Sequence, residues 1–194
     1  MLRRWLRLPL DHRGRFLPTD DSPRQPWFVA GSATAEGQAG TGNVQPMVLS
    51  ACGKQGSHLR RVGWGKYGLQ FDVPVNEARI SGGKPDVDYV RYVIKPINGD
   101  SYLELWFGPM AFSSEPDKEL LLNSVRVQKR KVVNVTGEEI GQDSSGKLKT
   151  GKIWRHTFFL VGGADGTQYE SVQENVELFN RIVDSACFVS PPRT

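Results

Sequence analysis

His156 is the residue whose type points most directly to chemistry, because a histidine can act as a general base near neutral pH. It lies in IWRHTFFLV (153–161), whose alternation predicts a strand with Trp154 and His156 on one apolar face. A histidine in that position is more often a buried core residue than a base. A hydrolase would also need a nucleophile and an orienting carboxylate, such as Asp165 or Glu104, within hydrogen-bond reach. We therefore keep a hydrolase as an alternative, and we expect no catalytic residue, no metal and no cofactor.

A second group of residues could bind rather than catalyse. The run RVQKRK (126–131) could contact a phosphate or an anionic membrane, although no aromatic residue interleaves it for base stacking, which favours a solvated strand end. Aromatic residues on predicted strands would mark a ligand groove or partner surface if several stayed exposed together. The candidate binding surface comprises Trp106, Trp154, Arg155, Arg126, Lys129 and Arg130.

The charge distribution restricts the partners. Residues 1–46 hold six Arg and four Asp or Glu (+2), Lys54 adds +1, and residues 58–194 hold 18 Lys or Arg and 17 Asp or Glu (+1), which sums to the net +4. A nucleic-acid-binding domain concentrates positive charge on its folded face, so nucleic acid is not expected as a partner. The expected partner is an unidentified protein or small ligand. A membrane would be reached only through a lipid on Cys52 or through the basic N-terminal region.

Composition divides the chain into three segments. Residues 1–57 are predicted to be a disordered basic and Gly-rich leader and linker, since prolines and the stretch AGSATAEGQAGTGN (30–43) disfavour a packed core. Residues 58–190 are expected to form one globular α+β domain, and residues 191–194 a short tail.

Hydrophobic periodicity predicts the elements of that domain. The turn Asn98-Gly99-Asp100 favours a hairpin over 87–108, and residues 141–152 are expected to be a polar loop. Further strands are predicted at 67–73, 153–161 and within 119–136, the last with a bulge, turn or exit from the sheet near 129–131.

The C-terminal part predicts a long helix. Thr167 and Glu170 fit a capping box, and apolar residues recur at helical spacing from Val172 to Ala186, which gives about five turns. The predicted fold class is therefore α+β: a mainly antiparallel sheet of about 5–7 strands with a long C-terminal amphipathic helix packed on one face.

Leu49-Ser50-Ala51-Cys52 resembles the lipobox of bacterial lipoproteins, and residues 53–57 resemble the hydrophilic tether that follows it. The resemblance implies that Cys52 carries the lipid and becomes the first residue of the mature protein. The residues before Cys52 depart from the pattern, because a signal peptide needs about 7–15 apolar residues there. The interpretation thus requires a start other than Met1. Cys187 offers an alternative for Cys52, a disulfide in an oxidising compartment, which spacing cannot establish.

The order of elements over 64–188 is similar to that of the PsbP-like α/β/α sandwich families, from KYGLQFDVP to GTQYESVQENVELFNRIVDSACF. Phe179 and Ser185 match a Phe and a Ser near the end of the last helix in those families. The resemblance implies a non-enzymatic accessory or binding protein, on the outer side of a membrane in several cases.

These observations favour a non-catalytic accessory or binding domain outside the cytoplasm, with an unknown ligand, in the form of a bacterial lipoprotein. It would be periplasmic or membrane-tethered if Cys52 is lipidated, and cytoplasmic otherwise. The alternatives are a soluble cytoplasmic protein-interaction module with a basic tail, and a hydrolase that uses His156.

Overall fold

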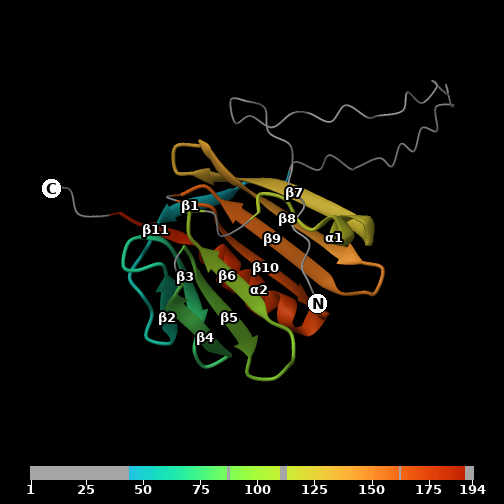
Figure 1. Cartoon of the computed structure of the whole chain (residues 1–194), viewed down its shortest axis with the longest axis horizontal. Helices are drawn as coiled ribbons and strands as arrows, with labels where there is room; N and C mark the ends of the chain where they lie inside the picture. The colour runs from blue at the N-terminus through green and yellow to red at the C-terminus, as the bar shows by residue number, and fades with distance from the viewer. Residues whose placement is uncertain (1–43, 87, 110–112, 162, 191–194) are drawn as a thin grey trace, which may run out of the picture. The chain divides into compact units, whose positions relative to one another are not determined.

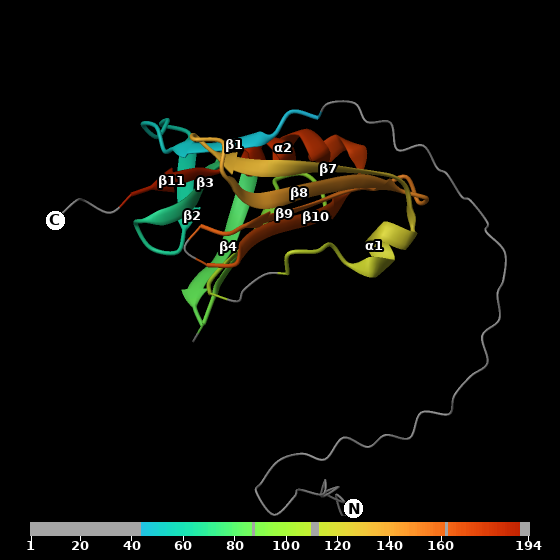
Figure 2. The same cartoon turned by 90° about the horizontal axis from the view of Figure 1, so that it is seen from above.

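The computed structural model describes residues 44–86, 88–109, 113–161 and 163–190 (Figures 1 and 2). Most of this part of the chain is β-strand. Its strands are β1 (Met47–Ala51), β2 (Leu59–Gly63), β3 (Gly68–Pro74), β4 (Ala78–Pro85), β5 (Val90–Pro96), β6 (Leu103–Phe107), β7 (Ser124–Asn134), β8 (Glu139–Leu148), β9 (Ile153–Phe159), β10 (Asp165–Ser171) and β11 (Cys187–Val189). Its helices are α1 (Lys118–Leu122) and α2 (Gln173–Asp184). No helix in the described ranges is long and apolar enough to cross a membrane.

All eleven strands belong to one sheet, in the order β2-β3-β11-β1-β7-β8-β9-β10-β6-β5-β4. β1 runs parallel to both of its neighbours, β11 and β7, whereas the other pairs are antiparallel. β1 therefore joins two antiparallel halves of the sheet.

The sheet curls until strands far apart in its order meet. Phe71 on β3 contacts Phe107 on β6 and Phe159 on β9, with ring centroids 5.8 Å apart in each pair. The Tyr92 hydroxyl on β5 donates to the Gly63 carbonyl on β2 at 3.1 Å. The sheet is thus a curled half-barrel whose inner face encloses the core (Figure 1).

α2 covers the inner face by packing against β3, β9 and β10. Its apolar stripe is buried, and each such side chain contributes about 1.5–3 kcal/mol on leaving water. Phe179 packs on Tyr169 of β10 with ring centroids 5.2 Å apart. After the helix, the Ser185 hydroxyl accepts the backbone N–H of Asp72 on β3 at 2.8 Å. α2 is therefore held between the two halves of the sheet.

The opposite, outer face of β9 is covered near α1. Trp154 on this face is fully buried, and its indole Nε1 donates to the Ser124 hydroxyl at 2.7 Å. Asp117 begins α1 by accepting the backbone N–H of Glu119 at 2.8 Å. Both faces of this region of the sheet are consequently covered, one by α2 and the other by the segment that contains α1.

The predicted fold class is wrong in strand number, in sheet type and in the length of the C-terminal helix. The sheet has eleven mixed strands, and α2 has 12 residues. Thr167 and Glu170 lie in β10 and not in a helix cap, because β10 pairs with β9 and β6 on either side. Val172 precedes the helix without a side-chain cap, and Cys187 already begins β11.

Two segments predicted to lie outside the sheet belong to it. The predicted loop 141–152 is mostly β8, which lies between β7 and β9. β1 falls within 1–57, so folded structure begins before residue 58. Residues 1–43 of the predicted leader and 191–194 of the predicted tail lie outside the described residues.

Of three further local predictions, two are confirmed and one is misplaced. The hairpin over 87–108 is confirmed, with Val90 opposite Phe107 and Ile94 opposite Leu103. The strand predicted at 153–161 is confirmed as β9. The bulge predicted near 129–131 is misplaced, because the β7–β8 register shifts lie nearer the two ends of β7.

Candidate functional site

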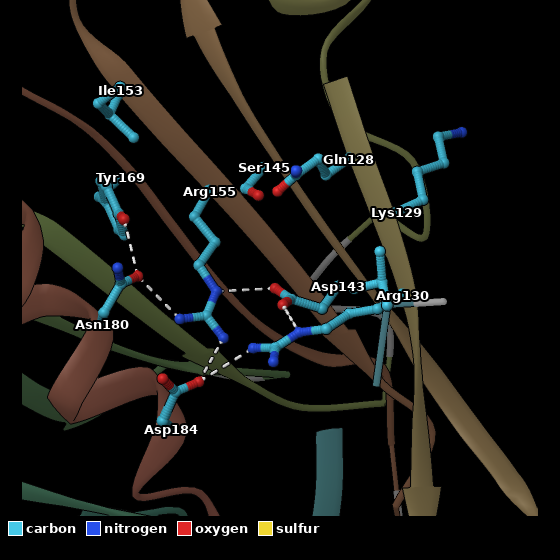
Figure 3. Close-up of a pocket in the computed structure, with 11 residues that line it drawn as sticks. Gln128, Lys129, Arg130, Asp143, Ser145, Ile153, Arg155, Tyr169, Asn180 and Asp184 are labelled. Atoms are coloured by element: carbon cyan, nitrogen blue, oxygen red, sulfur yellow. Dashed lines mark hydrogen bonds and ion pairs between the residues drawn. The ribbon is translucent and has the colours of Figure 1, made fainter. Parts of the chain in front are cut away.

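The main candidate site is an inner cavity of about 310 Å³ between α2 and the inner face of β7–β10 (Figure 3). Its side chains are mostly polar, and Arg155 lies at their centre. A separate groove of about 250 Å³ adjoins the cavity; it shares the lining residues Gln128, Ser145 and Ile153 and is also lined by Arg126 and Lys147. We call the two together the inner site.

Arg155 is placed by β9 and held by both the sheet and α2. Its Nε donates to Asp143 Oδ1 at 2.8 Å, its Nη1 to Asn180 Oδ1 at 2.8 Å and its Nη2 to Asp184 Oδ1 at 2.6 Å. The Tyr169 hydroxyl donates to the same Asn180 oxygen at 2.9 Å. Only 4% of Arg155 is exposed, and a buried guanidinium is tolerated only when it is paired in this way.

Asp143 on β8 is the carboxylate that anchors this network. It accepts hydrogen bonds from the Thr157 hydroxyl at 2.6 Å and from Arg130 Nε at 2.5 Å, besides Arg155. Burial alone would raise the pKa of Asp143, but Arg155, Thr157 and Arg130 outweigh burial and hold the pKa below its ordinary value of 3.8. The carboxylate is therefore charged at neutral pH, and the two arginines are fixed in position.

The groove end of the inner site has a different electrostatic character. Arg126 and Lys147 lie directly opposite each other on β7 and β8 and are exposed. Neither side chain forms a hydrogen bond or ion pair with another residue in the described ranges, and like charges in this arrangement repel. Arg130, deeper in the site, uses Nε and Nη2 for Asp143 and Asp184 and leaves Nη1 without a protein partner in that part of the chain.

The six residues predicted as a binding surface do not form one surface in the structure. Arg155, Arg130 and Arg126 line the inner site. Trp154 is buried beneath the α1 segment, since Ser124 accepts its indole N–H. Lys129 also contributes to the cavity lining, but its side chain extends away from the charge network around Arg155 (Figure 3). Trp106 lies on the outer face, in a second hollow.

That second hollow, which we call the outer groove, measures about 590 Å³. Its floor includes Trp106, Gln168 and His156, on β6, β10 and β9, and its wall comes from residues 113–118. Glu104 and His156 both lie opposite Gln168 on its two neighbouring strands, so the three side chains form a row across the outer face. The Glu104 carboxylate is nearly buried at one end of this row.

The structure does not place either of the two predicted carboxylates, Asp165 or Glu104, directly beside His156. Asp165 faces the inner side of the sheet, whereas His156 faces the outer side, as shown by their positions along paired strands. The Glu104 carboxylate is bound by Arg91, by Gln168 Nε2 at 2.8 Å and by Trp106 Nε1 at 3.2 Å. Burial lowers the pKa of His156 to about 4, so its imidazole is neutral at physiological pH.

The burial of Asp165 leads to a testable prediction about the pH dependence of stability. Burial raises its pKa to about 6, although the Gly108 N–H, which donates to Oδ1 at 2.9 Å, opposes the shift. Because the folded state then holds the proton more tightly than the unfolded chain, its contribution to stability is full below about pH 4 and is lost as pH rises through about 6. Asp165→Asn should therefore stabilise the protein by about 3 kcal/mol at pH 8 and leave it nearly unchanged at pH 4. Urea denaturation at both pH values measures this, and equal stabilities at pH 8 would contradict it.

Cys52, the predicted lipid-attachment residue, is bonded to Cys187. The sulfur atoms are 2.10 Å apart and the Cα atoms 4.8 Å apart. Beside the bond, the Cys52 N–H donates to the Phe188 carbonyl at 3.0 Å. A sulfur in a disulfide cannot carry a lipid, and cleavage before Cys52 would remove β1 from between β11 and β7. Lipidation of Cys52 stays a prediction, and it would require that this disulfide is absent.

Several residues of the inner site were not predicted. Asp143 and Ser145 lie in the segment expected to be a loop, and Tyr169 lies in a strand expected to begin a helix. Asn180 and Asp184 are four residues apart on α2 and therefore share a face, which is the one signal in the sequence that could have identified them.

Among the described residues, no group of three or more His, Cys, Asp or Glu side chains could hold a metal ion. No family model, no curated protein and no solved structure matches the chain. Its function is accordingly inferred from the chemistry of the inner site and the outer groove.

Proposed function

We propose that this protein is a non-catalytic binding domain that takes a small anion, a carboxylate or a phosphate, into the inner site. The observation that carries the proposal is the opposed pair Arg126 and Lys147, which has no acidic partner in the described ranges and lines a groove that adjoins the Arg155 cavity. An anion between the two cations would relieve their repulsion.

The deeper part of the inner site supports the same ligand class. Arg130 lines the cavity and keeps Nη1 without a partner in the described ranges, while Asp143 and Asp184 fix its guanidinium. A fixed guanidinium suits a planar carboxylate or a phosphate, because little side-chain entropy is lost on binding. Ser145 and Gln128 add neutral polar groups to the wall. A cationic ligand would instead meet Arg126, Lys147 and Arg130 together.

The disulfide supports a location outside the cytoplasm. Disulfides persist in oxidising compartments and are rare where glutathione and thioredoxin keep thiols reduced. The Cys52–Cys187 bond joins β1 to β11, the strands nearest the two ends of the described fold, and so suits a domain that works in such a compartment. We propose no lipid anchor on Cys52.

The proposal is tested by isothermal titration calorimetry with inorganic phosphate and with succinate at low ionic strength. Arg126→Glu/Lys147→Glu should weaken binding by at least about tenfold, because each charge-assisted hydrogen bond contributes about 1.5–3 kcal/mol. The matched control is Arg79→Glu/Lys95→Glu, which reverses a second pair of opposed cations, on β4 and β5, and does not line the inner site. Equal losses in both variants, or no binding of either anion by the wild type, would overturn the proposal.

A further inference from the structure

The outer groove is built independently of the inner site, on the opposite face of the sheet. Its aromatic residue, Trp106, is half-buried and firmly oriented. The Nε1 of Trp106 donates to Glu104 at 3.2 Å, the Arg91 guanidinium lies 5.0 Å from the ring centre, and the Tyr89 ring lies 5.4 Å away. Trp106 therefore offers a preorganised apolar surface beside polar groups.

The polar groups on the groove floor carry little net charge. Arg91 neutralises Glu104, whose pKa stays below its ordinary value because the hydrogen bonds from Gln168, Arg91 and Trp106 outweigh the effect of burial. The His156 imidazole is neutral at physiological pH, since burial lowers its pKa to about 4. The floor therefore presents fixed dipoles and an aromatic ring, without an uncompensated charge.

Gln168 is the polar floor residue best placed to receive a ligand. Its Nε2 donates to Glu104 at 2.8 Å, which fixes the orientation of the amide. Its Oε1 accepts no hydrogen bond from another side chain or backbone group in the described ranges, and the residue is only half-buried. On the wall, Ser113 and Glu115 are exposed and add a hydroxyl and a carboxylate.

We propose that the outer groove binds an uncharged saccharide, stacked on Trp106 and hydrogen-bonded through its hydroxyls to Gln168 and Glu115. A sugar ring has an apolar C–H face and a rim of hydroxyls, which match an oriented aromatic ring flanked by an amide acceptor and a carboxylate. An anionic ligand would find no unpaired cation among the described residues of the floor. The volume of about 590 Å³ lies within the range of small-molecule sites.

The experiment titrates the full chain with cellobiose, maltose and N,N′-diacetylchitobiose, using calorimetry and tryptophan fluorescence. We expect saturable binding of at least one disaccharide. The affinity should fall by about tenfold or more in Trp106→Ala, as is typical when a central aromatic contact is removed. Trp64→Ala is the matched control, because Trp64 is 44% exposed and does not line the groove. Glu115→Gln, at an exposed position that does not threaten folding, should weaken binding by about threefold, as expected for one surface hydrogen bond.

Three outcomes would overturn the saccharide assignment. One is the absence of saturable binding for all three sugars at millimolar concentrations. Another is an equal loss of sugar affinity in Trp106→Ala and Trp64→Ala. The third is binding of a lysine-rich peptide in place of any sugar. The Arg126→Glu/Lys147→Glu protein should bind the sugar normally, so this inference and the anion proposal fail or stand separately.

Discussion

Replacing both Cys52 and Cys187 by alanine is expected to lower the free energy of unfolding by about 4 kcal/mol. The bond joins residues 135 positions apart, so its loss frees a long loop in the unfolded chain. It also leaves β1 held to the rest of the fold mainly by its parallel pairing with β11 and β7. Equilibrium denaturation in guanidinium chloride under non-reducing conditions measures the change.

Reduction provides the control for this experiment. A reductant should lower the stability of the wild-type protein by a similar amount and leave the double-alanine protein unaffected, because the latter has no bond to break. A change of less than about 1 kcal/mol in the double variant would show that the bond does not constrain the chain as described. Trapping of a free thiol in the wild-type protein purified from an oxidising compartment would contradict the bond itself.

The same bond gives the residues around Cys52 a role in the fold that the sequence did not indicate. Leu49 and Met47 are buried in β1, so their apolar character serves the core rather than a cleavage site. The polar residues before them obscure the strand, which has only five residues. A short parallel strand depends on partners far along the chain, β7 and β11, and local patterns do not reveal such partners.

Elements with strong local signals were predicted from the sequence, and elements defined by distant partners were not. Asn98-Gly99 specifies the β5–β6 hairpin through turn chemistry, so that prediction holds. β8 has the loop-like sequence EIGQDSSGKL, yet Asp143 and Ser144 in it are buried. The charge on Asp143 is compensated by arginines from β7 and β9, which no window around residue 143 contains.

The candidate sites show the same limit. Arg155, Arg130 and Arg126 were identified as binding candidates because basic residues on strands are conspicuous in a sequence. Alternation along β9 placed Trp154 and His156 on one face, but it could not show that the α1 segment covers that face over Trp154 and forms a groove over His156. Pairing between strands, and not the pattern of a single strand, decides which face is accessible.

Asp143→Asn is expected to destabilise the protein by about 3 kcal/mol at pH 7, because it leaves two buried or half-buried guanidinium groups without their shared carboxylate. Arg155 and Arg130 would then depend on Asp184, which is 51% exposed and a weaker partner. The folded-state pKa of Asp143 is lowered. The ionised carboxylate therefore stabilises the fold above about pH 4, and this stabilisation is lost as pH falls through the folded-state pKa. The difference between wild type and variant should therefore shrink in acid. Urea denaturation from pH 7 down to pH 3 measures it.

Two further variants separate the charge network from a general effect of removing a carboxylate. Glu139→Gln removes the partner of Lys131 in an exposed ion pair of β7 and β8, and it should change stability by less than about 0.5 kcal/mol. Asp143→Leu/Arg155→Met replaces the buried pair by apolar side chains, and it should be more stable than Asp143→Leu alone, because it also removes the charge left without its partner. If the double variant is as unstable as the sum of its single substitutions, the two residues are not coupled. The network would then be a set of independent contacts and could not hold Arg130 in place for an anion.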